Sequence, residues 1–305
     1  PIGLGLIATA LQKRKHDVTL VDAVAENIPL LELIEITKKS NPDFVAINIF
    51  TTNFLLVKEF VEHYFNKNIV FIIGGLSTRT LYENIFQWKI ENEVIIVFGD
   101  GELITPDIVS YRTQESPNAT FKNKKFYKID SNSKYYCHNI DNIQLNREFF
   151  QNEPIKHPLG FLEANIITSR GCIYNCSFCA AARSLNRDLT AREMSAQCII
   201  RDLNEIKKFY PNVESIRVLD DLFLKNHTTI KKAITVFSSF NLKWRSMAHV
   251  MTFKGVPVED LKLLKSTGCS ELFIGIESGS PAVLRRIHKT HDINVIKRTL
   301  VAIFE

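Results

Sequence analysis

The pattern of apolar and polar positions divides the chain into two series of alternating helices and strands. In the first half, helical spacing predicts helices over 4–11, 30–39, 54–66 and 78–90, and short apolar runs predict strands over 17–22, 44–50, 69–73 and 93–98. Strands that are apolar throughout are typical of a parallel sheet with helices on both faces. Residues 1–110 are therefore expected to form an α/β domain of this kind.

Three turns in this half are candidates for a ligand site, because each follows a predicted strand. They are Thr51-Thr52, Gly74-Gly75 and Gly99-Asp100-Gly101-Glu102. Ligands of parallel α/β sheets bind beyond the carboxyl ends of the strands, and glycine lets a ligand approach the backbone closely. One such turn is explained by a tight strand–helix connection, whereas three in succession favour a ligand.

Residues 111–158 differ in character and are expected to link two domains. They are rich in Asn, Lys, Ser and Tyr and show little periodicity. A small hairpin is predicted within 119–127 and 135–136. Nothing in this segment has the pattern of a catalytic site.

The second half repeats a strand–helix unit four times. Strands are predicted over 164–168, 215–219, 243–248 and 271–276, and helices over 194–209, 230–240, 259–265 and 295–304. Such a series predicts part of a (β/α) barrel, whose chemistry lies at the C-terminal ends of the strands. Polar residues stand near those ends, namely Cys172, Asp220, Asp221, Arg245 and Glu277. Simpler roles remain open for four of them: helix capping for the two aspartates, an ion pair for Arg245 and a surface turn for Glu277.

The most informative stretch runs from Ser169 to Cys179 and contains Cys172, Cys176 and Cys179. A [4Fe–4S] cluster is normally held by four thiolates, so three would leave one iron open to another ligand. A zinc site would need a fourth Cys or His at suitable spacing, and a disulfide framework is typical of shorter, cysteine-dense secreted chains. Gly171 gives the backbone the freedom to enter a tight turn before the first cysteine. The other three cysteines are isolated and are expected to be ordinary small apolar residues.

This stretch resembles the Cys-x3-Cys-x2-Cys loop of the radical S-adenosylmethionine (radical SAM) superfamily. Gly275 to Gly279 is similar to a motif that lines the SAM site in that family, and Asp220 to Phe223 is similar to one that is common in its cobalamin-associated branch. The resemblance implies that SAM binds the open iron and is cleaved to a 5′-deoxyadenosyl radical. The SAM-binding residues that it implies are Phe178, against the adenine, with Asp220, Arg245, Gly275, Glu277 and Ser278.

The first half resembles the cobalamin-binding, Rossmann-like domain that precedes many radical SAM domains. The matching features are Pro1 to Leu4, Asn41 to Val45, Gly74-Gly75 and Gly99 to Glu102. The implied cobalamin-contacting residues are Thr51, Thr52, Gly74, Gly75, Gly99 and Glu102. The chain departs from the pattern at Asp100, where glutamate is usual, and it lacks both the first strand and an Asp-x-His-x-x-Gly motif.

Together these features predict a cobalamin-binding domain over 1–110, a linker over 111–158 and the first four units of a radical SAM barrel over 159–305. The family barrel usually has six units, so the chain is expected to be truncated at both ends. The predicted activity is a cobalamin-dependent methyl transfer from SAM to an unactivated carbon of a small molecule, with electrons from a flavodoxin or ferredoxin type donor. A radical rearrangement or cyclisation, an iron–sulfur electron carrier or sensor, and a cobalamin-binding regulatory module are the alternatives. Methylthiotransferases are disfavoured, since their leading domain brings cysteines and the first 136 residues here contain none.

Composition adds limits on partners and location. The net charge is +5, but the lysine pairs are scattered and form no basic stripe with aromatic residues, so nucleic acid is not expected. No apolar run approaches the roughly 20 residues of a membrane helix, and no signal peptide pattern is present. A cytoplasmic location is predicted, because an exposed iron–sulfur cluster suits a reducing compartment.

Overall fold

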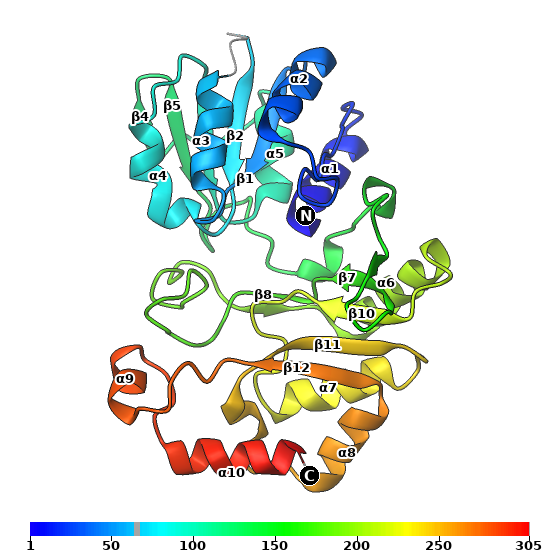
Figure 1. The fold of residues 1–305 in the computed structure, drawn as a ribbon. Coiled ribbons are helices and arrows are strands. Elements are labelled where there is room, and N and C mark those ends of the chain that lie inside the picture. The colour runs from blue at the N-terminus through cyan, green and yellow to red at the C-terminus, as the bar shows by residue number, and fades with distance from the viewer. Residues whose placement is uncertain (64–67, 305) are drawn as a thin grey trace. The chain divides into compact units, whose positions relative to one another are not determined.

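The computed structural model describes residues 1–63 and 68–304, which form two compact units. One unit contains Pro1–His138 and Ile143–Phe150, and the other contains Asn139–Asn142 and the residues from Gln151 onwards. Each unit has its own sheet, and the order of the elements can be followed in Figure 1.

The first unit is built on a five-stranded sheet. In spatial order its strands are β1 (Phe44–Asn48), β2 (Val70–Gly74), β3 (Val94–Phe98), β5 (Lys124–Lys128) and β4 (Ala119–Phe121). All neighbours are parallel except β4, which pairs with β5 as a hairpin. The parallel strands place their C-terminal ends along one edge, as the sequence predicts.

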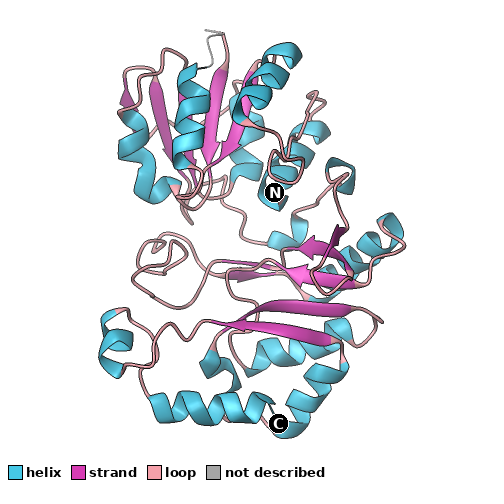
Figure 2. Cartoon of the chain, in the orientation of Figure 1, coloured by secondary structure: helices cyan, strands magenta, loops and turns pink. Residues whose placement is uncertain are grey.

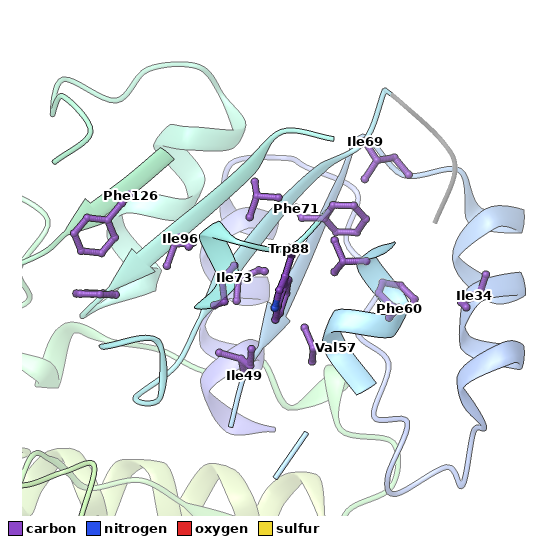
Figure 3. Close-up of a cluster of buried hydrophobic side chains, with 14 residues drawn as sticks. Ile34, Ile49, Val57, Phe60, Ile69, Phe71, Ile73, Trp88, Ile96 and Phe126 are labelled. Carbon is purple, nitrogen blue, oxygen red and sulfur yellow. The ribbon is translucent and has the colours of Figure 1, made fainter. Parts of the chain in front are cut away.

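Five helices cover this sheet: α1 (Ile2–Lys13), α2 (Leu30–Ser40), α3 (Phe54–His63), α4 (Thr78–Phe86) and α5 (Gly101–Val109). The core between the sheet and α2, α3 and α4 contains Phe71, Ile73 and Trp88, which are almost completely buried (Figure 3). Burying side chains of this size stabilises a fold by about 1.5–3 kcal/mol each. Helices α1 and α5 pack against each other on the other face (Figure 1).

Three segments of the first unit differ from the sequence prediction. Residues 17–22 form no strand, because they make no ladder with β1, which is the edge of the sheet. Helix α5 is absent from the prediction, since Pro106 and the surrounding glycine-rich turn obscure its helical spacing. The predicted helix over 54–66 is present as far as His63, and its last three residues lie outside the described part of the chain.

The segment 111–158, predicted to be a linker, supplies β4 and β5 and then divides between the two units. A hairpin is present, but both of its strands lie within 119–128, and the predicted partner Tyr135-Tyr136 is not a strand. Strand β5 pairs in parallel with β3, and its Phe126 reaches the hydrophobic core of the unit. Its three lysines made this pairing hard to recognise from composition.

The second unit has a five-stranded sheet of its own (Figure 2). Its order is β12 (Cys269–Ile274), β11 (Lys243–Ala248), β10 (Ser215–Val218), β7 (Leu162–Ile166) and β6 (Ile155–Lys156). The first four strands are parallel, and β6 is an antiparallel edge strand. The connecting and terminal helices are α6 (Ala196–Phe209), α7 (His227–Phe237), α8 (Val258–Ser266), α9 (Pro281–Arg286) and α10 (Ile293–Phe304).

The core of this unit lies between the sheet and its helices. The Trp244 ring of β11 stacks on Phe237 of α7 with the ring centroids 4.5 Å apart. Because side chains alternate along a strand, Arg245 and Met247 of β11 point to the opposite face. The four parallel units match the predicted partial barrel. Within the described part of the chain, no helix is both long and apolar enough to cross a membrane.

Candidate active site

The three-cysteine loop lies between β7 and α6. Strands β8 (Ser169–Arg170) and β9 (Arg192–Glu193) pair antiparallel, with Arg170 opposite Arg192. The loop between them is thus closed at its base by a short ladder. Gly171 begins the loop with a φ of 81°, which confirms the predicted tight turn.

Asp220, which follows β10, anchors the start of this loop. Its Oδ1 accepts the Thr168 N–H, and its Oδ2 accepts the hydroxyls of Thr168 and Ser169, each at 2.6 Å. Burial raises the pKa of Asp220, and the bonds from Ser169 and Thr168 act against that rise. Both carboxylate oxygens are therefore occupied by the chain itself, and a contact with SAM stays a prediction.

Asp221 completes the anchor. Its Oδ2 accepts the N–H of Gly171 at 3.0 Å, although its side chain is otherwise exposed. The two consecutive carboxylates thus hold Thr168, Ser169 and Gly171, which precede Cys172, and neither caps a helix.

The three cysteines of the loop are free and partly exposed. Burial raises the pKa of Cys172, and the charges of Asp221, Cys179 and Cys176 raise it further against the N–H of Tyr174. The sulfurs are thus close enough to repel one another as thiolates. Among the described residues no three Cys, His, Asp or Glu side chains gather as the ligands of a single ion would. A [4Fe–4S] cluster has four irons, so each cysteine takes a separate iron and the ligands spread farther apart. The donor set fits such a cluster.

The turn after β12 brings Glu277 back over the strand end. A side chain at Gly275 would meet Glu277 Oε1 at 2.4 Å, so the glycine leaves the space that this carboxylate occupies. Lys289 Nζ donates to the Gly275 carbonyl at 3.0 Å and lies 3.5 Å from Glu277 Oε1. Ser278 Oγ accepts the N–H of Ser280 at 3.1 Å and stabilises the same turn.

His249 follows β11 and contacts the loop through Tyr174. The two rings stack with centroids 3.8 Å apart, and His249 Nδ1 accepts the Met251 N–H at 3.2 Å. Burial, followed by the charge of Lys289, lowers the pKa of His249 to about 4. The imidazole is therefore neutral near pH 7, with its proton on Nε2.

Arg245 is placed away from the loop, in the first half of β11. Its Nε and Nη2 bind both oxygens of the buried Glu163 at 2.8 and 2.6 Å, and its Nη1 lies 3.4 Å from Glu271 Oε2. The structure thus shows the ion pair that the sequence left open, and a SAM contact of Arg245 stays a prediction. On the same face, one step nearer the C-terminal ends, Met247 and Phe273 are paired and exposed. The loop adds the exposed ring of Phe178.

In the first unit the three predicted turns lie side by side, since β1, β2 and β3 are adjacent and parallel. Thr51 and Thr52 are exposed, and Glu102 is buried in the first turn of α5. Gly75 and Gly99 have φ values of 112° and 99°, and a side chain at Gly99 would meet the Ile129 carbonyl at 2.7 Å. A methyl group added at Gly74 would meet one atom of the described residues within 4 Å, the Val97 carbonyl oxygen at 3.9 Å. The predicted placement is confirmed, while the role of these residues as ligands stays a prediction.

Comparisons with known proteins agree with this division. Residues 1–109 match the family model of the B12 binding domain, and residues 166–305 match that of the radical SAM superfamily. The chain is a radical SAM protein with an N-terminal B12-binding domain. The fold is that of the cobalamin-dependent S-adenosylmethionine radical enzyme OxsB, solved with aqua-cobalamin and S-adenosylmethionine bound. That match has a TM-score of 0.70 at 18% identity, over 99% of this chain and 45% of OxsB.

Two curated relatives of this radical SAM protein are named for methyl transfer. It is 27% identical to an uncharacterised methyltransferase of Pyrococcus horikoshii, over 95% of this chain and 63% of the relative. It is 23% identical to the hopanoid C-3 methylase of Methylococcus capsulatus, over 95% of this chain and 55% of that enzyme. The chain thus spans a little over half of the length of these relatives.

Sequence reasoning missed two side chains near the cysteine loop. His249 follows a predicted strand directly, so the rule that singled out the other strand ends could have found it. Lys289 carries no such signal, because it reaches Gly275 only through the short helix α9, which the sequence pattern does not reveal.

Proposed function

We propose that this chain is the cofactor-binding part of a cobalamin-dependent radical SAM methyltransferase that acts on an unactivated carbon of a small molecule. The observation that carries this proposal is the pairing of two sites in one chain: a three-cysteine loop at the end of a parallel strand, and a B12-binding fold with three adjacent turns. The names of the two relatives support methyl transfer, and the hopanoid C-3 methylase supports carbon as the acceptor.

In this proposal Cys172, Cys176 and Cys179 hold a [4Fe–4S] cluster. When bound, the cluster supplies the electron that cleaves SAM, and cobalamin carries the methyl group. The chain positions the loop that holds the cluster, because Asp220 and Asp221 fix the start of that loop through the hydrogen bonds described above. Three thiols with a shared anchor can bind three irons without further movement of the sheet.

The chain also offers groups that suit SAM. The Glu277 carboxylate is near enough to raise the pKa of Cys176, although burial and Cys179 do so more strongly. A carboxylate beside the loop suits the ammonium group of SAM, and the exposed ring of Phe178 suits stacking on adenine.

Cobalamin would lie over the turns that contain Thr51-Thr52, Gly74-Gly75 and Gly99. Beside Gly75, Asn48 Oδ1 is buried and has no hydrogen-bond partner among the described residues. A buried acceptor of this kind is costly unless a donor reaches it, and the corrin ring carries amide donors at its periphery.

The electron donor would be a flavodoxin or ferredoxin, and the free cysteines suit the cytoplasm.

Anaerobic reconstitution with iron, sulfide and hydroxocobalamin tests the proposal, followed by incubation with SAM and dithionite. We expect two products, 5′-deoxyadenosine and S-adenosylhomocysteine, to be detected by liquid chromatography and mass spectrometry. A variant with all three loop cysteines changed to alanine should form no 5′-deoxyadenosine.

The products also separate the alternatives. Formation of 5′-deoxyadenosine without S-adenosylhomocysteine would favour a radical rearrangement or cyclisation. A chain that binds iron and sulfide but leaves SAM intact would be an electron carrier or sensor, and the proposal would be wrong.

A further inference from the structure

Lys289 lies against the turn that follows β12, and the proposed function gives it no role. It follows α9, its side chain is only 11% exposed, and its Nζ contacts the Gly275 carbonyl and Glu277 Oε1. Glu277 has a φ of 69°, a left-handed conformation that a non-glycine residue adopts only when its surroundings hold it. The ammonium group of Lys289 is one of those surroundings.

The same segment is attached to the cysteine loop. The N–H of Ser177, next to Cys176, donates to the Ile287 carbonyl at 3.2 Å, two residues before Lys289. The charge of Lys289 opposes burial at Cys176 by lowering the thiol pKa, and it adds to burial in lowering the pKa of His249. Lys289 is therefore within electrostatic reach of a loop cysteine and of the residue that stacks on the loop.

We propose that Lys289 is a positioning residue for the SAM and cluster site: it fixes the Glu277 carboxylate, and its charge raises the reduction potential of a cluster bound by the loop. This inference rests on the proposed function.

The physical reason is the charge balance of the site. With a cluster bound, the three thiolates, Asp221 and Glu277 are negative and His249 is neutral, and Lys289 supplies a positive charge within reach of Cys176 and Glu277. Reducing the cluster adds one electron from the external reductant and forms or breaks no bond to the protein. A nearby positive charge stabilises the reduced, more negative state, and net charge is among the factors that set such potentials.

A redox titration of the reconstituted full chain, followed by electron paramagnetic resonance, tests this. The variants are Lys289→Met, which removes the charge, Lys289→Arg, which keeps it, and Lys265→Met as the control. Lys265 is in the last turn of α8, which ends just before the N-terminal end of β12, whereas Glu277 and Lys289 follow the C-terminal end of that strand. Circular dichroism and iron content check that each variant is folded and loaded.

We expect Lys289→Met to lower the ratio of reduced to oxidised cluster about tenfold at a fixed potential, which is a shift of about 59 mV for one electron. Lys289→Arg should stay near the parent, and Lys265→Met should be unchanged. A loaded Lys289→Met variant with the parent's potential would overturn the electrostatic role. If the parent itself binds no cluster, the proposed function fails first, so the two failures are distinguishable.

A double-mutant cycle tests the link to Glu277. The change that SAM produces in the spectrum of the reduced cluster is titrated in the parent, Lys289→Met, Glu277→Gln and the double variant. If Lys289 acts through Glu277, the loss of SAM affinity in the double variant will be clearly less than the two single losses combined. Independent losses would overturn the positioning role.

Discussion

At the scale of single residues, the buried carboxylate of Asp220 anchors the start of the cysteine loop. Asp220→Asn leaves an amide that cannot accept from all three donors, so Thr168 and Ser169 lose buried partners. We expect the free energy of unfolding to fall by about 3 kcal/mol, and iron uptake by the loop to fall with it. Urea denaturation and iron analysis measure the two effects.

Asp221→Asn is the matched control for Asp220, because the carboxylate accepts only the Gly171 N–H and the oxygen of an asparagine amide can still accept it. Its cost should stay under about 1 kcal/mol. Equal effects of the two substitutions would contradict the anchoring role of Asp220.

His249 predicts a pH dependence of stability. The pKa of His249 is about 4 in the folded chain and 6.5 in its ordinary state, so between these values the unfolded chain binds a proton that the folded chain does not. Stability is therefore complete above about pH 6.5 and is lost as the pH falls towards 4, by on the order of 3 kcal/mol. Unfolding curves of the cluster-free protein measure this, with His249→Gln for comparison. Parallel pH profiles of the two proteins would contradict it.

The residues identified from the sequence differ in how much of their role the sequence alone determines. The three cysteines and Gly171 carry their signal in local spacing, and their shared loop follows from it. Arg245 could not be assigned, because its choice between an ion pair and a ligand depends on Glu163, which lies 82 positions earlier in the chain. Contacts of that range are set by strand register, which the pattern of a single strand does not contain.

At the scale of elements, the turns after β2 and β3 use glycine for different reasons. A side chain at Gly99 would meet backbone and side-chain atoms of Ile129 below 3 Å at a φ of 99°, whereas the space beside Gly74 is open. Gly99→Ala should therefore lower the free energy of unfolding by at least about 2 kcal/mol. Thermal or urea unfolding checks this, and Gly74→Ala, the control, should change it little.

Gly74 also provides a test of the cobalamin site. Gly74→Leu places a large side chain in the space that a corrin ring needs and should leave the sheet folded. The variant should lose the visible corrin absorbance that the parent gains with hydroxocobalamin, yet keep its iron–sulfur band. A folded variant that still takes up cobalamin like the parent would move the site away from this turn.

The order of strands and helices could be predicted because buried parallel strands and amphipathic helices repeat with different periods. The prediction failed for two kinds of segment. Residues 17–22 have the pattern of a strand but no ladder partner, and pairing rather than pattern makes a strand. Helix α9 has only six residues, too few for a helical period to show.

At the scale of the whole molecule, the two units have separate sheets and separate hydrophobic cores. Changing the three loop cysteines to alanine should therefore abolish iron uptake and leave the binding of hydroxocobalamin by the first unit within about twofold of the parent, since each unit folds around a core of its own. Absorption spectroscopy of the two cofactors in the same sample measures both. Loss of cobalamin together with iron would show that the sites depend on each other.

The ladder between β8 and β9 has a consequence for how such a site can change over evolution. Because Arg170 and Arg192 are paired in a separate two-stranded ladder, the cysteine loop begins and ends at neighbouring points. Insertions or deletions between Cys179 and β9 would lengthen or shorten the loop without shifting β7 or β10. Closing a longer loop costs only a little more free energy. That stretch is where related chains can acquire new surroundings for the same three thiols while inheriting an unchanged sheet.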